Sequence, residues 1–176
     1  DSGVRDGKDA AITVLSGSIW HNVRATRYII RHCISNNILH YRLSSALFPL
    51  ITDENTDVSY EDLPDKVSIQ EELKFAGKIA KDFNVSIGSH PDQFNVLASP
   101  DREKVARTIN ELNFQASIFD KIGLPQDHTA PMNIHVNYTP QADETLELVA
   151  TRFFRNLSMC DKGVYKRLTI ENEDKG

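Results

Sequence analysis

Two histidines and one glutamate stand out in this sequence because together they could bind a metal ion. His90, His135 and Glu171 each lie at or near the end of a short segment with the composition of a β-strand. Two imidazole nitrogens and a carboxylate oxygen suit a borderline divalent cation such as Zn2+ or Mn2+. The other four histidines fall on expected helices, loops or strand starts, where a structural role is commoner: His21, His32, His40 and His128.

The segments that carry the candidate ligands alternate between apolar and polar residues. They are residues 39–44 (LHYRLS), 85–90 (VSIGSH), 132–137 (MNIHVN) and 168–172 (LTIEN). Strands that are buried on both faces usually read as continuous apolar runs. Here one face is apolar and the other collects polar groups, which end in Ser44, His90, His135 with Asn137, and Glu171. This pattern predicts a polar site at the carboxyl ends of the strands.

Helices are expected between these strands, and three of them have a recognisable start. Ser68 with Glu71 forms a capping box, while Ser99-Pro100 and Thr139-Pro140 each read as an N-cap followed by proline. The predicted helices cover residues 22–36, 68–82, 99–122 and 139–163, with Phe75, Leu146 and Phe154 on their buried faces. Residues 10–15 (AAITVL) fit a short strand or a helix, and residues 1–18 otherwise carry little pattern.

The alternation of helices and strands favours an α/β fold with a parallel sheet. A polar face at the carboxyl strand ends is typical of a (β/α)8 TIM barrel, although a smaller open α/β sheet also fits, and an antiparallel sheet with one solvated face fits less well. Such a barrel takes about 250 residues. We therefore expect the 176 residues to form a single domain, 1–176, that covers roughly the middle half of a barrel.

Composition excludes several other classes of protein. The chain is 40 % hydrophobic and 26 % charged, which is too apolar for a disordered tail, and no run approaches the length of a membrane span. Cys33 and Cys160 have no CxxC partner, so a disulfide scaffold is not expected. No secretory signal is visible, and we expect an intracellular protein, in the cytoplasm or nucleoid, without membrane contact.

Four blocks of the sequence resemble the UV-damage endonuclease family. They are residues 42–50 (RLSSALFPL), 89–97 (SHPDQFNVL), 133–137 (NIHVN) and 167–174 (RLTIENED), and the helix segment 109–124 is similar to the same family. The resemblance implies a metal-dependent TIM-barrel endonuclease for DNA repair. It would cut damaged double-stranded DNA immediately 5′ to ultraviolet photoproducts with divalent metals, typically manganese, with zinc or magnesium as alternatives. We expect the protein to be a monomer.

The same resemblance assigns roles to individual residues. It makes His90, His135 and Glu171 metal ligands, with Glu171 bridging two ions and taking part in catalysis. Gln93 and Phe94 match a polar–aromatic pair that enters the duplex and probes the damaged bases, which is a physically sensible wedge. The chain departs from the family after FPL, where Asp53 stands near the position of a further histidine ligand. Asp53 could replace that histidine as an oxygen ligand, or this part of the site could be lost.

Arg42 is the expected catalytic cation, because it could neutralise phosphate charge at the barrel mouth. The net charge of −5 opposes binding to DNA, but bound divalent cations would invert the sign of the site. Two other functions stay open at this point. One is a metal-dependent sugar isomerase or epimerase on the same barrel, and the other is a non-catalytic module that binds damaged DNA.

Overall fold

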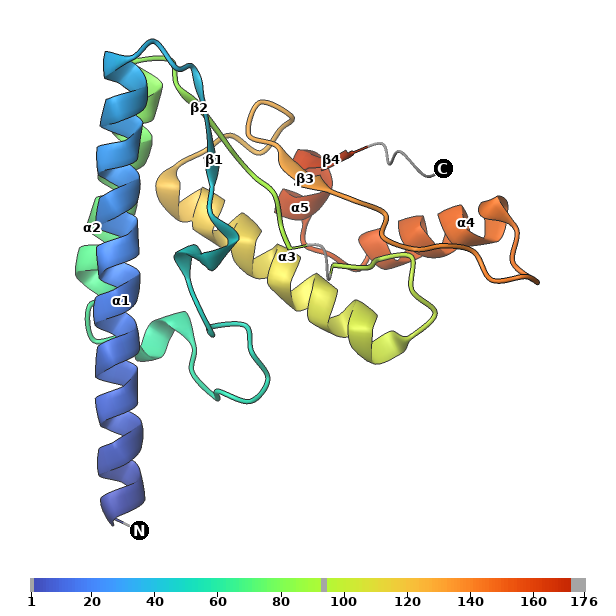
Figure 1. Cartoon of the computed structure of the whole chain (residues 1–176), viewed down its shortest axis with the longest axis horizontal. Helices are drawn as coiled ribbons and strands as arrows, with labels where there is room; N and C mark the ends of the chain where they lie inside the picture. The colour runs from blue at the N-terminus through green and yellow to red at the C-terminus, as the bar shows by residue number, and fades with distance from the viewer. Residues whose placement is uncertain (1, 93–94, 172–176) are drawn as a thin grey trace. The chain divides into compact units, whose positions relative to one another are not determined.

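The computed structural model describes residues 2–92 and 95–171 (Figure 1). The chain divides into two compact units, of which the first comprises Asp1–Ser86 with Lys121–Gly123 and the second Ile87–Asp120 with Leu124–Gly176. The prediction of a single domain is not tested by this division and stays a prediction. Of the helices in the described residues, none is both long enough and apolar enough to cross a bilayer.

The first unit is built on two helices that lie side by side, α1 (Ser2–Ser35) and α2 (Lys66–Asp82). Their facing sides bury Ile19, Val23, Ile69 and Leu73 completely. Residues 10–15 belong to α1, so the helical alternative is the correct one for that segment. Helix α1 ends where Asn37 adopts a positive φ of 56° and the amide of Ile38 returns to the Cys33 carbonyl, close to the predicted end.

Three short elements complete the first unit. Strand β1 (His40–Leu43) follows α1, and the 3-10 helices η1 (Ser45–Leu47) and η2 (Tyr60–Asp62) lie between it and α2. In α2, Gly77 packs so closely on the end of α3 that a Cβ built there would lie 2.0 Å from the Ile122 carbonyl oxygen. Because any Cβ would clash here, the close contact between Gly77 and Ile122 requires glycine at this position.

The second unit contains the parallel strands that carry the candidate site. Strand β2 (Ser86–Ser89) pairs with β3 (Met132–Ile134), and β3 pairs with β4 (Leu168–Ile170). Within this unit the strand order is β2-β3-β4, whereas Ser86 of β2 belongs to the first unit. Ile87, Met132 and Ile134 are fully buried, which agrees with the predicted apolar face. The predicted parallel sheet is therefore confirmed.

Helices α3 (Arg102–Ile122), α4 (Leu146–Leu157) and α5 (Lys162–Arg167) follow the strands. The four predicted helix starts are wrong, and the helix expected over residues 22–36 is part of α1, which begins at Ser2. Helix α2 begins two residues before Ser68, after Asp65. In α3 the cap is Asp101, whose carboxylate accepts from the amides of Glu103 and Lys104. In α4 it is Thr145, whose hydroxyl accepts from the Leu148 amide. The predicted end of α3 before Gly123, which has a φ of 87°, is confirmed.

Some predicted core residues lie at the surface instead. The exposed fractions of Phe75, Leu146 and Phe154 are 44 %, 77 % and 61 %. Phe75 stands beside the buried stripe of α2, beneath the Arg27 guanidinium, and Leu146 occupies the first position of α4. The predicted helix 139–163 is in fact a loop followed by α4 and α5, and Gly163 is buried inside α5.

Arg167 is the largest side chain that is fully buried in the described residues. Its guanidinium donates to the carbonyls of Pro125, Ala116 and Leu124 and, over 2.7 Å, to the carboxylate of Asp120. A buried cation is tolerated when its donors are satisfied and it is paired. Arg167 therefore holds the end of α5, immediately before β4, against the end of α3 within the second unit.

Candidate metal centre

The three candidate ligands leave the ends of neighbouring parallel strands. His90 follows β2, His135 follows β3 and Glu171 follows β4. The backbone is fixed close to each of them, because the Ser89 amide donates to Pro131 and the Glu171 amide donates to Ile134, both over 2.9 Å. Carboxyl ends of parallel strands meet at one edge of a sheet, which is why residues so far apart in sequence converge here.

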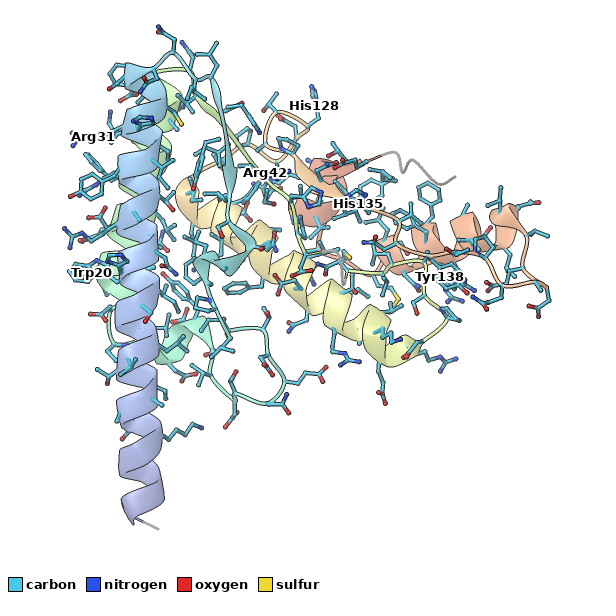
Figure 2. All side chains as sticks on the ribbon, viewed as in Figure 1. Trp20, Arg31, Arg42, His128, His135 and Tyr138 are labelled. Carbon is cyan, nitrogen blue, oxygen red and sulfur yellow. The ribbon has the colours of Figure 1, made fainter. Side chains whose placement is uncertain are left out.

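The three side chains form a compact donor set. His90 Nε2 lies 3.2 Å from Glu171 Oε2 and His135 Nε2 lies 3.8 Å from the same oxygen. One ligand atom from each residue lies within 4.8 Å of the other two, and the imidazole rings meet edge to face with centroids 5.0 Å apart. In Figure 2, His135 lies on the chain that leaves β3.

The distances from the two imidazole nitrogens to the Glu171 oxygen fit a divalent cation. Two ligand atoms that are each about 2.1 Å from one ion lie at most about 4.2 Å apart, and both nitrogen–oxygen distances meet this condition. The side chains are 21 %, 27 % and 47 % exposed for His90, His135 and Glu171, so an ion and a substrate could reach them from solvent. Two imidazoles and one carboxylate are donors that Zn2+ and Mn2+ accept.

Glu171 has two further neighbours on the same face of the sheet. Asn133 Nδ2 donates to Glu171 Oε2 over 2.7 Å, and the Thr169 hydroxyl donates to Asn133 Oδ1 over 3.0 Å. The alternation of polar residues places Asn133 on the face of His135, but it gives no indication of the contact with Glu171. That contact depends on the register between β3 and β4, in which Asn133 stands opposite Thr169.

The loops that follow His90 and His135 are both tied to α4. Arg152 donates to the Ala98 carbonyl and, over 2.7 Å, to Glu144, which also accepts from the Tyr138 hydroxyl. The Asn156 amide donates to the Leu97 carbonyl over 2.8 Å. Hydrogen bonds from Arg152 and then from Tyr138 lower the pKa of Glu144 to about 2. These contacts could not be predicted from the sequence, because the residues that form them belong to no recognisable local motif.

Arg42 and Asp53 belong to the first unit. Arg42 is an exposed residue of β1. Asp53 is exposed in the loop after η1, where its carboxylate accepts from the backbone amide and the side chain of Asn55, and these hydrogen bonds lower its pKa. The catalytic role of Arg42 and the ligand role of Asp53 stay predictions. Gln93 and Phe94 lie outside the described residues, so their role in lesion binding also stays a prediction.

Comparison with known proteins gives one consistent family. The family model described as UV-endonuclease UvdE matches residues 6–176. A UV DNA damage endonuclease of Nostoc sp. strain PCC 7120 is 30 % identical over 154 residues, covering 88 % of this chain and 44 % of that protein. A UV DNA damage endonuclease of Bacillus cereus strain B4264 is 27 % identical over 172 residues, covering 97 % and 50 %.

A solved structure shares the fold. The crystal structure of SacUVDE matches with a TM-score of 0.77 and 28 % sequence identity, over 90 % of this chain and 51 % of that one. The predicted fold class is thereby confirmed: the chain is α/β and forms roughly half of a (β/α)8 barrel. The chain spans about half the length of the relatives that it matches.

Proposed function

The chain belongs to the UV-endonuclease UvdE family, and from this premise we propose that the protein is a DNA repair endonuclease. It would hydrolyse the phosphodiester bond 5′ to ultraviolet photoproducts in double-stranded DNA, with divalent metal held by His90, His135 and Glu171. The observation that carries the proposal is the convergence of these three side chains within 4.8 Å, in a chain that matches the family over residues 6–176.

The chemistry of each side chain in the site indicates the role that it would have. When bound, a divalent cation supplies Lewis-acid polarisation of the phosphate and a water of lowered pKa. The imidazoles of His90 and His135 would hold it through nitrogen, and Glu171 would add negative charge and bridge to a second ion. Arg42 would neutralise phosphate charge, and Asp53 would serve as an oxygen ligand.

Manganese is the metal we propose. Magnesium favours oxygen ligands and retains its waters, so a set with two imidazole nitrogens is less suited to it than to manganese or zinc. Between the latter two, the choice of manganese follows the resemblance to the family. A cationic centre also answers the objection raised by the net charge of −5, because the local sign at the site is set by the bound ions.

Lesion recognition is assigned to Gln93 and Phe94. The aromatic ring would enter the base stack beside the photoproduct, and the amide would form hydrogen bonds to the displaced bases. Their place in the chain supports this assignment, because they follow the candidate ligand His90 by three and four residues. No observation favours a sugar isomerase over the nuclease.

The test is incision of ultraviolet-irradiated supercoiled plasmid by the complete gene product in the presence of manganese. We expect conversion to the nicked form, with breaks that map immediately 5′ to the photoproducts, while unirradiated plasmid stays supercoiled. Equal nicking of both plasmids, or none of either, would contradict the proposal. Selective binding of irradiated DNA without incision at any manganese concentration would favour the damage-binding module instead.

A further inference from the structure

Asn133 forms hydrogen bonds with both the candidate ligand Glu171 and Thr169 of the neighbouring strand. It is a β3 residue opposite Thr169 of β4, and its side chain lies on the face that carries Glu171. The Asn133 amide nitrogen donates to Glu171 Oε2 over 2.7 Å, and the Asn133 amide oxygen accepts from the Thr169 hydroxyl over 3.0 Å. The three side chains therefore form a relay from Thr169 through Asn133 to Glu171.

The relay has only one orientation that satisfies all of its members. An ionised carboxylate only accepts hydrogen bonds, so Asn133 must turn its NH2 group toward Glu171. Its carbonyl oxygen then faces Thr169, whose hydroxyl can donate to it. Rotating the amide by half a turn would place two acceptors against each other at Glu171. The Glu171 carboxylate thus sets the orientation of Asn133, and the Thr169 hydroxyl adds a hydrogen bond that holds the amide in that orientation.

The oxygen that Asn133 holds is the one that faces both histidines. Glu171 Oε2 lies 3.2 Å from His90 Nε2 and 3.8 Å from His135 Nε2. The backbone of Glu171 is fixed by its hydrogen bond to the Ile134 carbonyl, but its side chain is 47 % exposed. A partly exposed glutamate has several rotamers of similar energy, and fixing one of them costs conformational entropy. Asn133 removes that freedom before any ion arrives.

We propose that Asn133 is a positioning residue of the metal centre and that Thr169 acts through it. The proposal rests on the metal site proposed above. Side chains that orient a metal ligand typically change metal affinity by about 10–100-fold when they are removed. Asn133 would act on the ion through Glu171, and Thr169 would act on Glu171 through Asn133, so the effects of removing Thr169 and Asn133 should not add.

The experiment measures Mn2+ affinity of the complete gene product by calorimetric titration, with electron paramagnetic resonance of free Mn2+ as a second readout. The site is defined as the binding that Glu171→Gln removes. We expect Asn133→Leu to weaken this binding by about 10–100-fold. Thr169→Val, which keeps the shape of the side chain, should weaken it in the same direction by less. The control Thr129→Val removes an exposed hydroxyl that donates to Asp127, and it should leave affinity unchanged.

A double-mutant comparison separates positioning from a loss of fold. In the Asn133→Leu background, which keeps Glu171, Thr169→Val should cause no additional loss of Mn2+ affinity, since Thr169 contacts Glu171 through Asn133. Wild-type affinity in both Asn133→Leu and Thr169→Val, or a full additional loss when Thr169→Val is combined with Asn133→Leu, would overturn the positioning role. If wild type shows no Mn2+ binding that Glu171→Gln removes, the metal site of the proposed function fails instead.

Discussion

Phe94 allows lesion recognition to be tested with a single side chain. If its ring enters the base stack, Phe94→Ala should remove about 1–3 kcal/mol of interaction with the damaged duplex, as base–aromatic stacking does elsewhere. Selectivity for irradiated over intact duplex should then fall about ten- to a hundredfold. Competition binding with the two duplexes measures this ratio, and Gln93→Ala should lower it by less because it loses little contact area.

The control for this prediction is Phe154→Ala, which removes an aromatic ring that is 61 % exposed on α4 and should leave the ratio unchanged. The metal content of Phe94→Ala should equal that of wild type, because the ring is no ligand. If Phe94 instead packs in a core, its removal would cost about 3–5 kcal/mol of stability. Reduced thermal stability with intact selectivity would therefore refute the wedge.

The candidate ligands could be predicted from sequence, whereas their supporting contacts could not. His90, His135 and Glu171 are recognisable because each ends a strand with a polar face, and a parallel sheet gathers strand ends at one edge. The hydrogen bond between Asn133 and Glu171 depends on register, which a sequence pattern of short strands does not specify. The contact of Arg152 with Ala98 joins residues 54 apart in sequence, and no local pattern encodes it.

At the scale of elements, the order of helices and strands followed from sequence but the helix starts did not. Serine and threonine before proline are local signals, and a nearby acidic group can take over the capping role. Asp101 does so in α3 by accepting two backbone amides. In the loop after Thr139, Glu144 accepts hydrogen bonds from Tyr138 and Arg152. Arg152 lies in the following helix, α4, so no local pattern indicates this contact.

The substitution Gly77→Ala tests how closely α2 packs on the last turn of α3. A methyl group at this position would lie 2.0 Å from the Ile122 carbonyl oxygen and 2.7 Å from its Cγ2 atom, so the two elements would have to separate. We expect Gly77→Ala to lower the free energy of unfolding by about 1–3 kcal/mol, which is the usual cost of overpacking, despite the better helix propensity of alanine. Urea unfolding of the variant and wild type measures the difference.

Gly17→Ala is the matched control, because Gly17 also lies inside a helix but a Cβ there would meet nothing within 4 Å. Alanine is favoured over glycine in a helix interior by about 0.8–1.0 kcal/mol, so this variant should be more stable than wild type. Opposite signs for the two substitutions are the expected result. Stabilisation by both would show that α2 does not approach Ile122 as closely as the structure has it.

At the scale of the whole molecule, the barrel class was predictable because strands and helices alternate at long, regular intervals, which is a strong signal. The solved relative shares this fold over 90 % of the chain, and the chain covers about half of that relative. The division into two compact units was not foreseen, since no change in composition marks it. The chain covers about half the length of its relatives, and the tests of function therefore use the complete gene product.

The most direct test of the central claim measures bound manganese and incision together in Glu171→Gln. This substitution keeps the size of the side chain but removes the carboxylate that faces His90 and His135. We predict that the variant loses bound manganese and that incision of irradiated plasmid falls below detection, while it still binds irradiated DNA selectively. His135→Ala should behave alike, and Glu147→Gln, an exposed change on α4, should match wild type. Wild-type incision by Glu171→Gln would contradict the account.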